Sequence, residues 1–185
     1  IISRELLEKY IDYVPLDDKI LNSKEIQIGV DVARFGDDST IMYVKQGNYI
    51  IEEIKLDKKD TMQTANRVAR IVNEYSQNDI VAKIDGVGVG GGVIDRLAEL
   101  QFPNLNIIEI QNNARAFNEN EYCNAITEMF YEINEFLKCG FVSMPDDSEL
   151  IEDLAGRKYE FDSKGRLRIE SKDEFKKRFG RSPDK

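Results

Sequence analysis

Apolar residues recur along the chain in two spacings, one typical of strands and one typical of helices. The strand pattern begins at Ile26 and recurs over residues 39–45, 49–56, 80–85 and 105–110, with a short hairpin over 158–161 and 167–169. Helical spacing predicts helices over residues 3–10, 60–75, 93–100, 118–137, 146–155 and 172–179. Three strands joined by tight turns form an antiparallel meander, and the helix–strand alternation after them adds parallel strands. The predicted fold is therefore α/β, a mixed sheet of about five or six strands with helices on both faces and a C-terminal hairpin-and-helix appendage.

Polar residues mark the starts of several helices. Asp60, Asn118 and Ser171 are each followed three positions later by Gln or Glu, which is the spacing of a capping box. In the helix expected to open at Asn118, apolar side chains at helical spacing form a stripe that should face the core: Tyr122, Ile126, Met129, Ile133, Phe136 and Leu137. The length of 185 residues suits one well-cored domain over residues 25–185, preceded by a helix and linker over residues 1–24.

Asp31 interrupts the apolar strand that begins at Ile26, where the strand is expected to be still buried. A buried carboxylate without a partner is costly, so such a residue normally has a metal ion, a cation or several donors beside it. A second interpretation is that Asp31 only ends the strand and caps the turn over residues 36–39. This stretch alone leaves both interpretations open.

A second aspartate, Asp85, ends the strand predicted over residues 80–85. A right-handed crossover through a helix should place that strand parallel to an existing one, for which the Asp31 strand is the central apolar candidate. As neighbours, the two aspartates would lie side by side near the strand ends, where open α/β sheets place their sites. Adjacent carboxylates repel each other unless a divalent cation lies between them. The pair therefore predicts a site for Mg²⁺ or Mn²⁺, where two ions about 3.5–4 Å apart can hold both reacting oxygens of a phosphodiester.

The glycine-rich segment after Asp85 allows two other interpretations. Gly86, Gly88 and Gly91 have the spacing of a dinucleotide-binding turn, and Glu109 ends the next strand as a ribose-binding acid would. Asp85, however, would face the bound phosphate without a basic residue to compensate it. No Gly-Lys-Ser/Thr sequence occurs, which excludes a Walker loop. The remaining interpretation is a packing turn without a ligand.

Composition narrows the chemistry. The chain has no histidine, which excludes Ser-His-Asp and Cys-His systems and most zinc sites, so carboxylates and hard metal ions must lead any catalysis. Two cysteines, Cys123 and Cys139, form neither a metal-ligand spacing nor a disulfide framework. No apolar run approaches the ~20 residues of a membrane helix, and no secretory signal is visible. These features favour a reduced, cytosolic compartment.

Charge is divided unevenly along the chain. Residues 157–185 hold 11 Lys/Arg against 6 Asp/Glu, whereas residues 1–156 hold 15 against 29. A basic arm on an acidic body suits a metal site that serves a polyanion, although a solvated charged tail would have the same composition. The side chains predicted to contact such a polyanion, for example DNA, lie in this arm: Lys172, Lys176, Lys177, Arg178 and Arg181.

Four segments carry a family pattern in the same order. They are GVDVARFGDDST at 29–40, IDGVGVG at 84–90, NARAF at 113–117, and IESKDEFKKR at 169–178 followed by RSPD at 181–184. Together they resemble the C-terminal nuclease domain of phage terminase large subunits, the DNA-packaging motors. The resemblance spans about residues 26–185 and implies an RNase H-like fold with metal-dependent endonuclease activity on double-stranded DNA.

The resemblance also implies roles for individual residues. Asp31 and Asp85 resemble the first two catalytic, metal-binding carboxylates, and Asp37 and Asp38 resemble supporting acids beside Mg²⁺ or Mn²⁺. The family's third carboxylate lies in or just after the Ser-Pro-Asp segment, typically within a following Ala-Asp-Ala. The sequence ends at Lys185, so Asp184 is the candidate here.

The partners implied by the resemblance are double-stranded DNA, the terminase ATPase domain, the portal and the small terminase subunit. The compartment implied is the cytoplasm of an infected or lysogenic bacterial host. Residues 1–20 resemble the linker from the packaging ATPase, which is not in this sequence. A non-catalytic alternative stays open: a domain without the third carboxylate would bind DNA or other motor parts without cutting.

Overall fold

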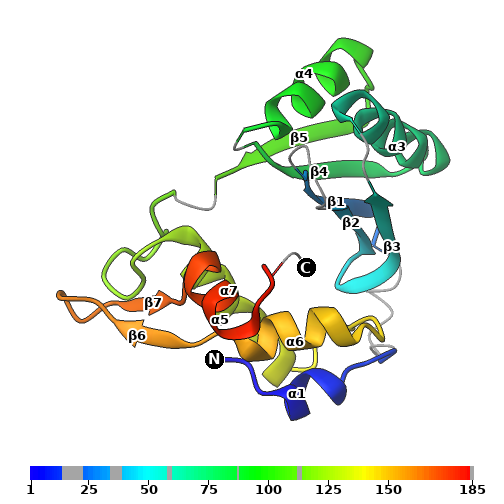
Figure 1. Cartoon of the computed structure of the whole chain (residues 1–185). Coiled ribbons are helices and arrows are strands. Elements are labelled where there is room, and N and C mark those ends of the chain that lie inside the picture. The colour runs from blue at the N-terminus through cyan, green and yellow to red at the C-terminus, as the bar shows by residue number, and fades with distance from the viewer. Residues whose placement is uncertain (14–22, 34–38, 58–59, 87, 112–113, 184–185) are drawn as a thin grey trace. The chain divides into compact units, whose positions relative to one another are not determined.

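The computed structural model describes residues 1–13, 23–33, 39–57, 60–86, 88–111 and 114–183. The chain divides into two compact units, one formed by residues 15–111 and the other by residues 1–14 together with 112–185. In the described residues, the first unit holds a five-stranded sheet with two helices, and the second holds four helices and a two-stranded hairpin (Figure 1).

The sheet unit confirms the predicted mixed sheet. Its strands are β1 Glu25–Asp31, β2 Ser39–Gln46, β3 Tyr49–Asp57, β4 Asp79–Asp85 and β5 Leu105–Ile110. They lie in the order β3-β2-β1-β4-β5. The β1–β2 and β2–β3 pairs are antiparallel, whereas the β1–β4 and β4–β5 pairs are parallel. The meander therefore comes first, and the crossover strands extend the sheet on the other side of β1.

Helices α3 (Thr61–Glu74) and α4 (Gly90–Leu100) cover one face of this sheet (Figure 1). The predicted capping box opens α3: the Asp60 carboxylate accepts the Gln63 N–H at 2.7 Å, and the Gln63 side chain accepts the Asp60 N–H. Because strand side chains alternate between faces, every second residue of β1 and β4 points toward these helices. The core between sheet and helices includes Ile26, Ile28, Val30, Met42, Val44, Val68, Ile71, Ile80, Ala82, Ile84, Val93 and Leu97.

The second unit is mainly helical. Its elements are α1 Arg4–Glu8, α5 Ala125–Lys138, α6 Ser148–Gly156, β6 Tyr159–Phe161, β7 Leu167–Ile169 and α7 Lys172–Phe179. The hairpin and the last helix form where the sequence predicted them, and Ser171 with Glu174 makes the expected capping box. Across the parts of the chain that the structure describes, none of the helices has the length and apolar character needed to span a membrane.

Helix α5 differs from its prediction in both start and buried face. It begins at Ala125 with Asn124 as its cap, whereas Asn118 lies in a preceding turn. Of the predicted apolar stripe, Leu137 is buried, whereas Phe136 is 46% exposed. The other buried residues of α5 lay outside the predicted stripe: Thr127, Phe130 and Asn134. A polar position can be buried here because the Thr127 hydroxyl accepts the Ile169 N–H of β7 at 3.1 Å. The next helix, α6, begins at Ser148, two residues after the predicted start at 146, and is capped by Asp147.

Candidate metal centre

Asp31 and Asp85 end two strands that lie side by side. Strands β1 and β4 are parallel neighbours in which Val30 pairs with Ile84, so the two aspartates occupy the next position along each strand. Neighbouring strands are about 4.8 Å apart, and successive residues point to opposite faces. Val30 and Ile84 point into the core under α3 and α4. Both aspartates therefore lie at the carboxyl edge of the sheet, on its opposite face, and the predicted adjacency of the strands is confirmed.

The surroundings of Asp31 differ from the expectation of burial. Along β1, Ile28 and Val30 are buried, whereas Gly29 and Asp31 are exposed, and on β4 Asp85 is half-buried. The expectation was wrong because the apolar residues of β1 belong to only one face of the strand. An exposed carboxylate keeps most of its hydration, so burial gives it no need for a charged partner. The feature that favours a cation is thus the closeness of two like charges.

Two carboxylates on adjacent strand ends suit a hard divalent ion, since Mg²⁺ and Mn²⁺ prefer oxygen ligands. Among the residues that the structure describes, no cluster of three or more His, Cys, Asp or Glu side chains is placed to hold a metal. Further ligands would come from water, from the substrate or from other parts of the chain. The predicted acids Asp37, Asp38 and Asp184 lie outside the described residues, so their roles stay predictions.

The glycine-rich segment after Asp85 makes a tight connection between β4 and α4. Gly90 begins α4 so close to the strand that a Cβ there would overlap the carbonyl oxygen of Asp85. Gly88 has a φ of +87°, in the left-handed region that favours glycine. A dinucleotide-binding fold is built from βαβ units on a mostly parallel sheet, whereas β1, β2 and β3 form an antiparallel meander. The dinucleotide-binding interpretation was therefore wrong, and the close approach at Gly90 helps to fix the backbone of Asp85.

Gly90 and Gly91 provide a matched test of this connection. We expect Gly90→Ala to lower the free energy of unfolding by about 1–3 kcal/mol, because its Cβ would force α4 away from β4. At Gly91 an added Cβ would meet nothing within 4 Å. Gly91→Ala should therefore stabilise the protein by about 0.5–1 kcal/mol, since Ala is the better helix former. Urea unfolding of both variants measures the difference, and equal midpoints would show that the approach at Gly90 is not tight.

The basic arm contains exposed lysines and paired arginines. Three of the residues predicted to contact DNA are exposed lysines of α7: Lys172, Lys176 and Lys177. Arg178 instead pairs with Glu170, and Arg181 pairs at 2.6 Å with Asp153, whose side chain is 1% exposed. The two arginines therefore connect α7 and the segment after it to other parts of the same unit.

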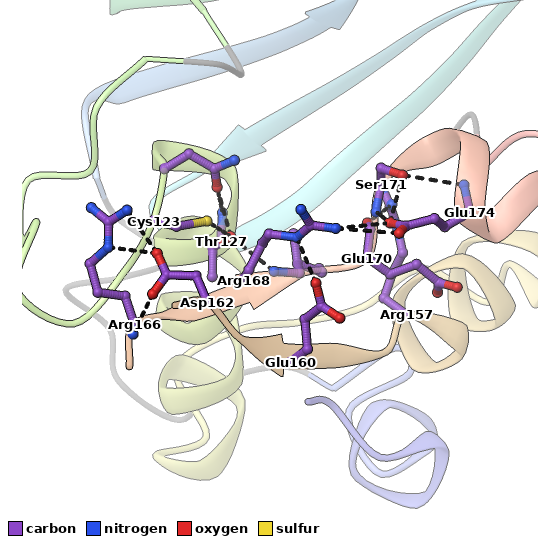
Figure 2. A network of polar contacts seen from close by, with 12 residues as sticks. Cys123, Thr127, Arg157, Glu160, Asp162, Arg166, Arg168, Glu170, Ser171 and Glu174 are labelled. Atoms are coloured by element: carbon purple, nitrogen blue, oxygen red, sulfur yellow. Dashed lines mark hydrogen bonds and ion pairs between the residues drawn. The ribbon is translucent and has the colours of Figure 1, made fainter. Parts of the chain in front are cut away.

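A polar network joins the hairpin to α7 and was missed from the sequence (Figure 2). The buried Arg157 side chain donates to the Glu170 carbonyl oxygen at 2.5 Å and lies 5.7 Å from the ring centre of Phe175. The Glu170 carboxylate accepts two bonds from Arg178, and this pairing holds the pKa of Glu170 below its ordinary value. Glu170 is separated by 13 residues from Arg157 and by 8 from Arg178. Arg157 follows α6 and Arg178 lies in α7, so these residues belong to different elements and only the folded hairpin brings them together.

The mixed sheet, with its antiparallel meander and parallel crossover strands, defines an RNase H-like α/β fold. No protein-family model and no curated protein sequence matches the chain. The nuclease domain of the large terminase subunit gp2 of bacterial virus Sf6 matches over 99% of this chain and 93% of its own length, with 16% identity and a TM-score of 0.78. The large terminase nuclease of thermophilic phage G20c, solved with bound cobalt, matches over 98% and 90%, with 15% identity and a TM-score of 0.62. The chain thus has the fold of phage large terminase nuclease domains.

Other structures of the same two proteins contain different metals. A mutant of the Sf6 domain was solved with manganese and β-thujaplicinol, and it matches this chain with 17% identity and a TM-score of 0.80. The G20c nuclease was also solved with bound magnesium.

Proposed function

We propose that this chain contains, over residues 25–185, the nuclease domain of a phage terminase large subunit. It would be a Mg²⁺- or Mn²⁺-dependent endonuclease that cuts double-stranded viral DNA concatemers during genome packaging. The observation that carries the proposal is the placement of Asp31 and Asp85 at adjacent ends of parallel strands, in a fold shared with such domains. Its partners would be the terminase ATPase domain, the portal and the small terminase subunit, in the cytoplasm of the bacterial host.

Asp31 and Asp85 would hold the divalent metal from two adjacent strands, with Asp184 as the third carboxylate and Asp37 and Asp38 as supporting acids. When bound, the ion supplies a Lewis acid that lowers the pKa of water and neutralises charge on a phosphodiester. Paired strands fix the first two carboxylates, so little side-chain ordering is needed when DNA arrives. Because the chain has no histidine, carboxylates are the proton acceptors that it offers at this edge of the sheet.

Plasmid cleavage by the wild-type protein tests the proposal. In Mn²⁺ or Mg²⁺, supercoiled plasmid should become nicked and linear, and EDTA should stop the reaction. The competing function is a module that binds DNA or motor parts without cutting. A gel-shift assay separates the two functions. The competing function predicts that the protein binds the duplex and leaves it uncut in every metal tested.

The exposed lysines of α7 should strengthen DNA binding without regard to base sequence. We expect Lys176→Glu with Lys177→Glu to weaken duplex binding and to reduce the slope of log K against log salt by roughly one unit for each phosphate that is no longer neutralised. Lys138→Glu is the control, since that ammonium already pairs with Glu135 at 2.7 Å. Binding titrations across salt concentrations give the slopes. A slope equal to that of wild type would mean that these lysines form only a solvated surface.

A further inference from the structure

The middle of β1 carries a glycine that the fold itself does not explain. Gly29 lies on the face that carries Asp31 and is exposed. A Cβ built on it would meet nothing within 4 Å, and its φ is not in the left-handed region. Neither packing nor backbone conformation therefore requires glycine here. Since glycine weakens a strand interior, an unexplained glycine there often marks the close approach of a ligand or another backbone.

Lys83 lies beside this glycine on the same face. It is the β4 partner of Gly29, its side chain is exposed, and its ammonium donates to the Gln27 amide oxygen at 3.2 Å. On the other side of Gly29, the paired residue of β2 is Tyr43. The backbone of β1 is thus uncovered between a cationic side chain and an aromatic one. We call this feature the Gly29 strip, made of Gly29, Lys83 and Tyr43.

The Gly29 strip lies one strand repeat from the aspartate pair. Gly29 and Lys83 precede Asp31 and Asp85 by two residues on their strands, which brings them back to the same face about 6.6 Å away. Successive phosphates along one strand of DNA have a similar separation. A phosphodiester chain whose scissile phosphate lies at the aspartate pair could therefore place its next phosphate at Lys83.

Two lysines lie beside each other at the strip, and the acids on the same face include Glu25 and Glu53, the β3 partner of Tyr43. Lys45 of β2 lies close enough to interact with Lys83: burial, and then repulsion from Lys83, lowers the pKa of Lys45, while Glu25 opposes this shift. The Gln27 side chain lies between a cation and an anion: its amide oxygen accepts from Lys83, and its amide nitrogen donates to Glu25. A phosphate beside Lys83 would reduce the repulsion between the two ammonium groups.

We propose that the Gly29 strip is the subsite for the phosphate next to the scissile one, with the DNA backbone crossing β1 at Gly29 and the Lys83 ammonium binding that phosphate. The inference rests on the proposed nuclease function and extends it by naming the path of the DNA strand. Lys83 is a positioning residue, because it holds the backbone and does not touch the reacting atoms.

Gly29→Val gives the sharpest test, because an added Cβ meets nothing within 4 Å in the folded protein, whereas under the proposal it would meet the DNA backbone. Valine favours strands, so the unfolding midpoint should equal or exceed that of wild type. Binding of a short duplex without divalent ions should nevertheless weaken by about tenfold or more, the order expected when one charge-assisted hydrogen bond no longer forms. Normal binding with an unchanged fold would overturn the proposal.

Lys83→Ala tests the interaction with the phosphate itself. We expect the dissociation constant and KM to rise about tenfold with little change in kcat, and the salt slope to fall by about one unit. Lys83→Arg should restore most of the binding, whereas Lys138→Ala, an exposed lysine on α5, should leave binding unchanged. A wild-type salt slope in Lys83→Ala would overturn the proposal, because a merely structural lysine does not change how many phosphates the protein neutralises.

The binding and cleavage measurements test the two proposals independently. If the wild-type protein binds duplex but does not cut it in Mn²⁺, the proposed nuclease function is wrong. The binding results of the two variants then still show whether the Gly29 strip binds the DNA backbone. If it cuts DNA and both Gly29→Val and Lys83→Ala bind normally, the strip fails while the nuclease function stands. A wild-type protein that neither binds nor cuts duplex overturns both.

Discussion

Asp31→Asn should abolish Mn²⁺-dependent DNA cleavage and leave the protein folded. Loss of residues that only support metal ligands typically costs 10–100-fold, so removing a direct ligand should lower the rate by more than about 100-fold. The substitution keeps the size of the side chain and removes one of two neighbouring negative charges. The melting temperature should therefore not fall, since repulsion between the strand ends is relieved. Initial rates of plasmid nicking and thermal unfolding measure the two effects.

Glu25→Gln is the matched control for this experiment. Glu25 is exposed at the other end of β1 and, as an odd-numbered residue, lies on the same face as Asp31. It should keep nearly wild-type cleavage, which separates the loss of a metal ligand from a general change in charge. Asp85→Asn should behave like Asp31→Asn, because both carboxylates serve the same ion. Wild-type cleavage by either aspartate variant would contradict the proposed metal centre.

Phe175→Ala should cause the largest loss of stability in the helical unit, about 3–5 kcal/mol. Phe175 is fully buried, and its ring stacks on Phe179 at 4.3 Å between centres. The guanidinium groups of Arg157 and Arg178 each lie 5.7 Å from the same ring centre. The guanidinium of Arg181 lies 5.9 Å from it. Truncation therefore creates a cavity and also removes three cation–π interactions.

Urea unfolding compares this variant with Phe161→Ala. Phe161 is 65% exposed on the hairpin, so its loss should change the free energy of unfolding by less than about 0.5 kcal/mol. A Phe175→Ala variant as stable as Phe161→Ala would show that the buried ring does not hold α7 in place.

The sheet was predictable because few topologies satisfy the chain's pattern. A right-handed crossover left the Asp31 strand as the natural neighbour for the Asp85 strand, and β1 and β4 pair in that way. The start of α5 was not predictable from local rules. Asn118 with Glu121 matches a capping box, yet the helix is capped by Asn124, and Thr127 in its first turn bonds to the distant β7. Tertiary contacts decided between two plausible caps.

Only those features of the site that depend on strand order could be predicted from the sequence. The adjacency of Asp31 and Asp85 follows from topology, but the exposure of Asp31 was missed because Gly29 and Asp31 alternate with apolar neighbours on a two-faced strand. The pairing of Arg178 was out of reach, since it depends on the hairpin bringing Glu170 beside α7. Sequence charge indicated a basic arm without showing which of its cations are already paired.

Locating bound Mn²⁺ by anomalous diffraction from crystals of this protein would decide whether the two aspartates form a metal centre. The proposed centre predicts a peak between the Asp31 and Asp85 carboxylates, with metal–oxygen distances of about 2.0–2.6 Å, the range for hard divalent ions. That peak should vanish in crystals of Asp31→Asn. A strong Mn²⁺ peak elsewhere, with both carboxylates free of metal, would contradict the proposal.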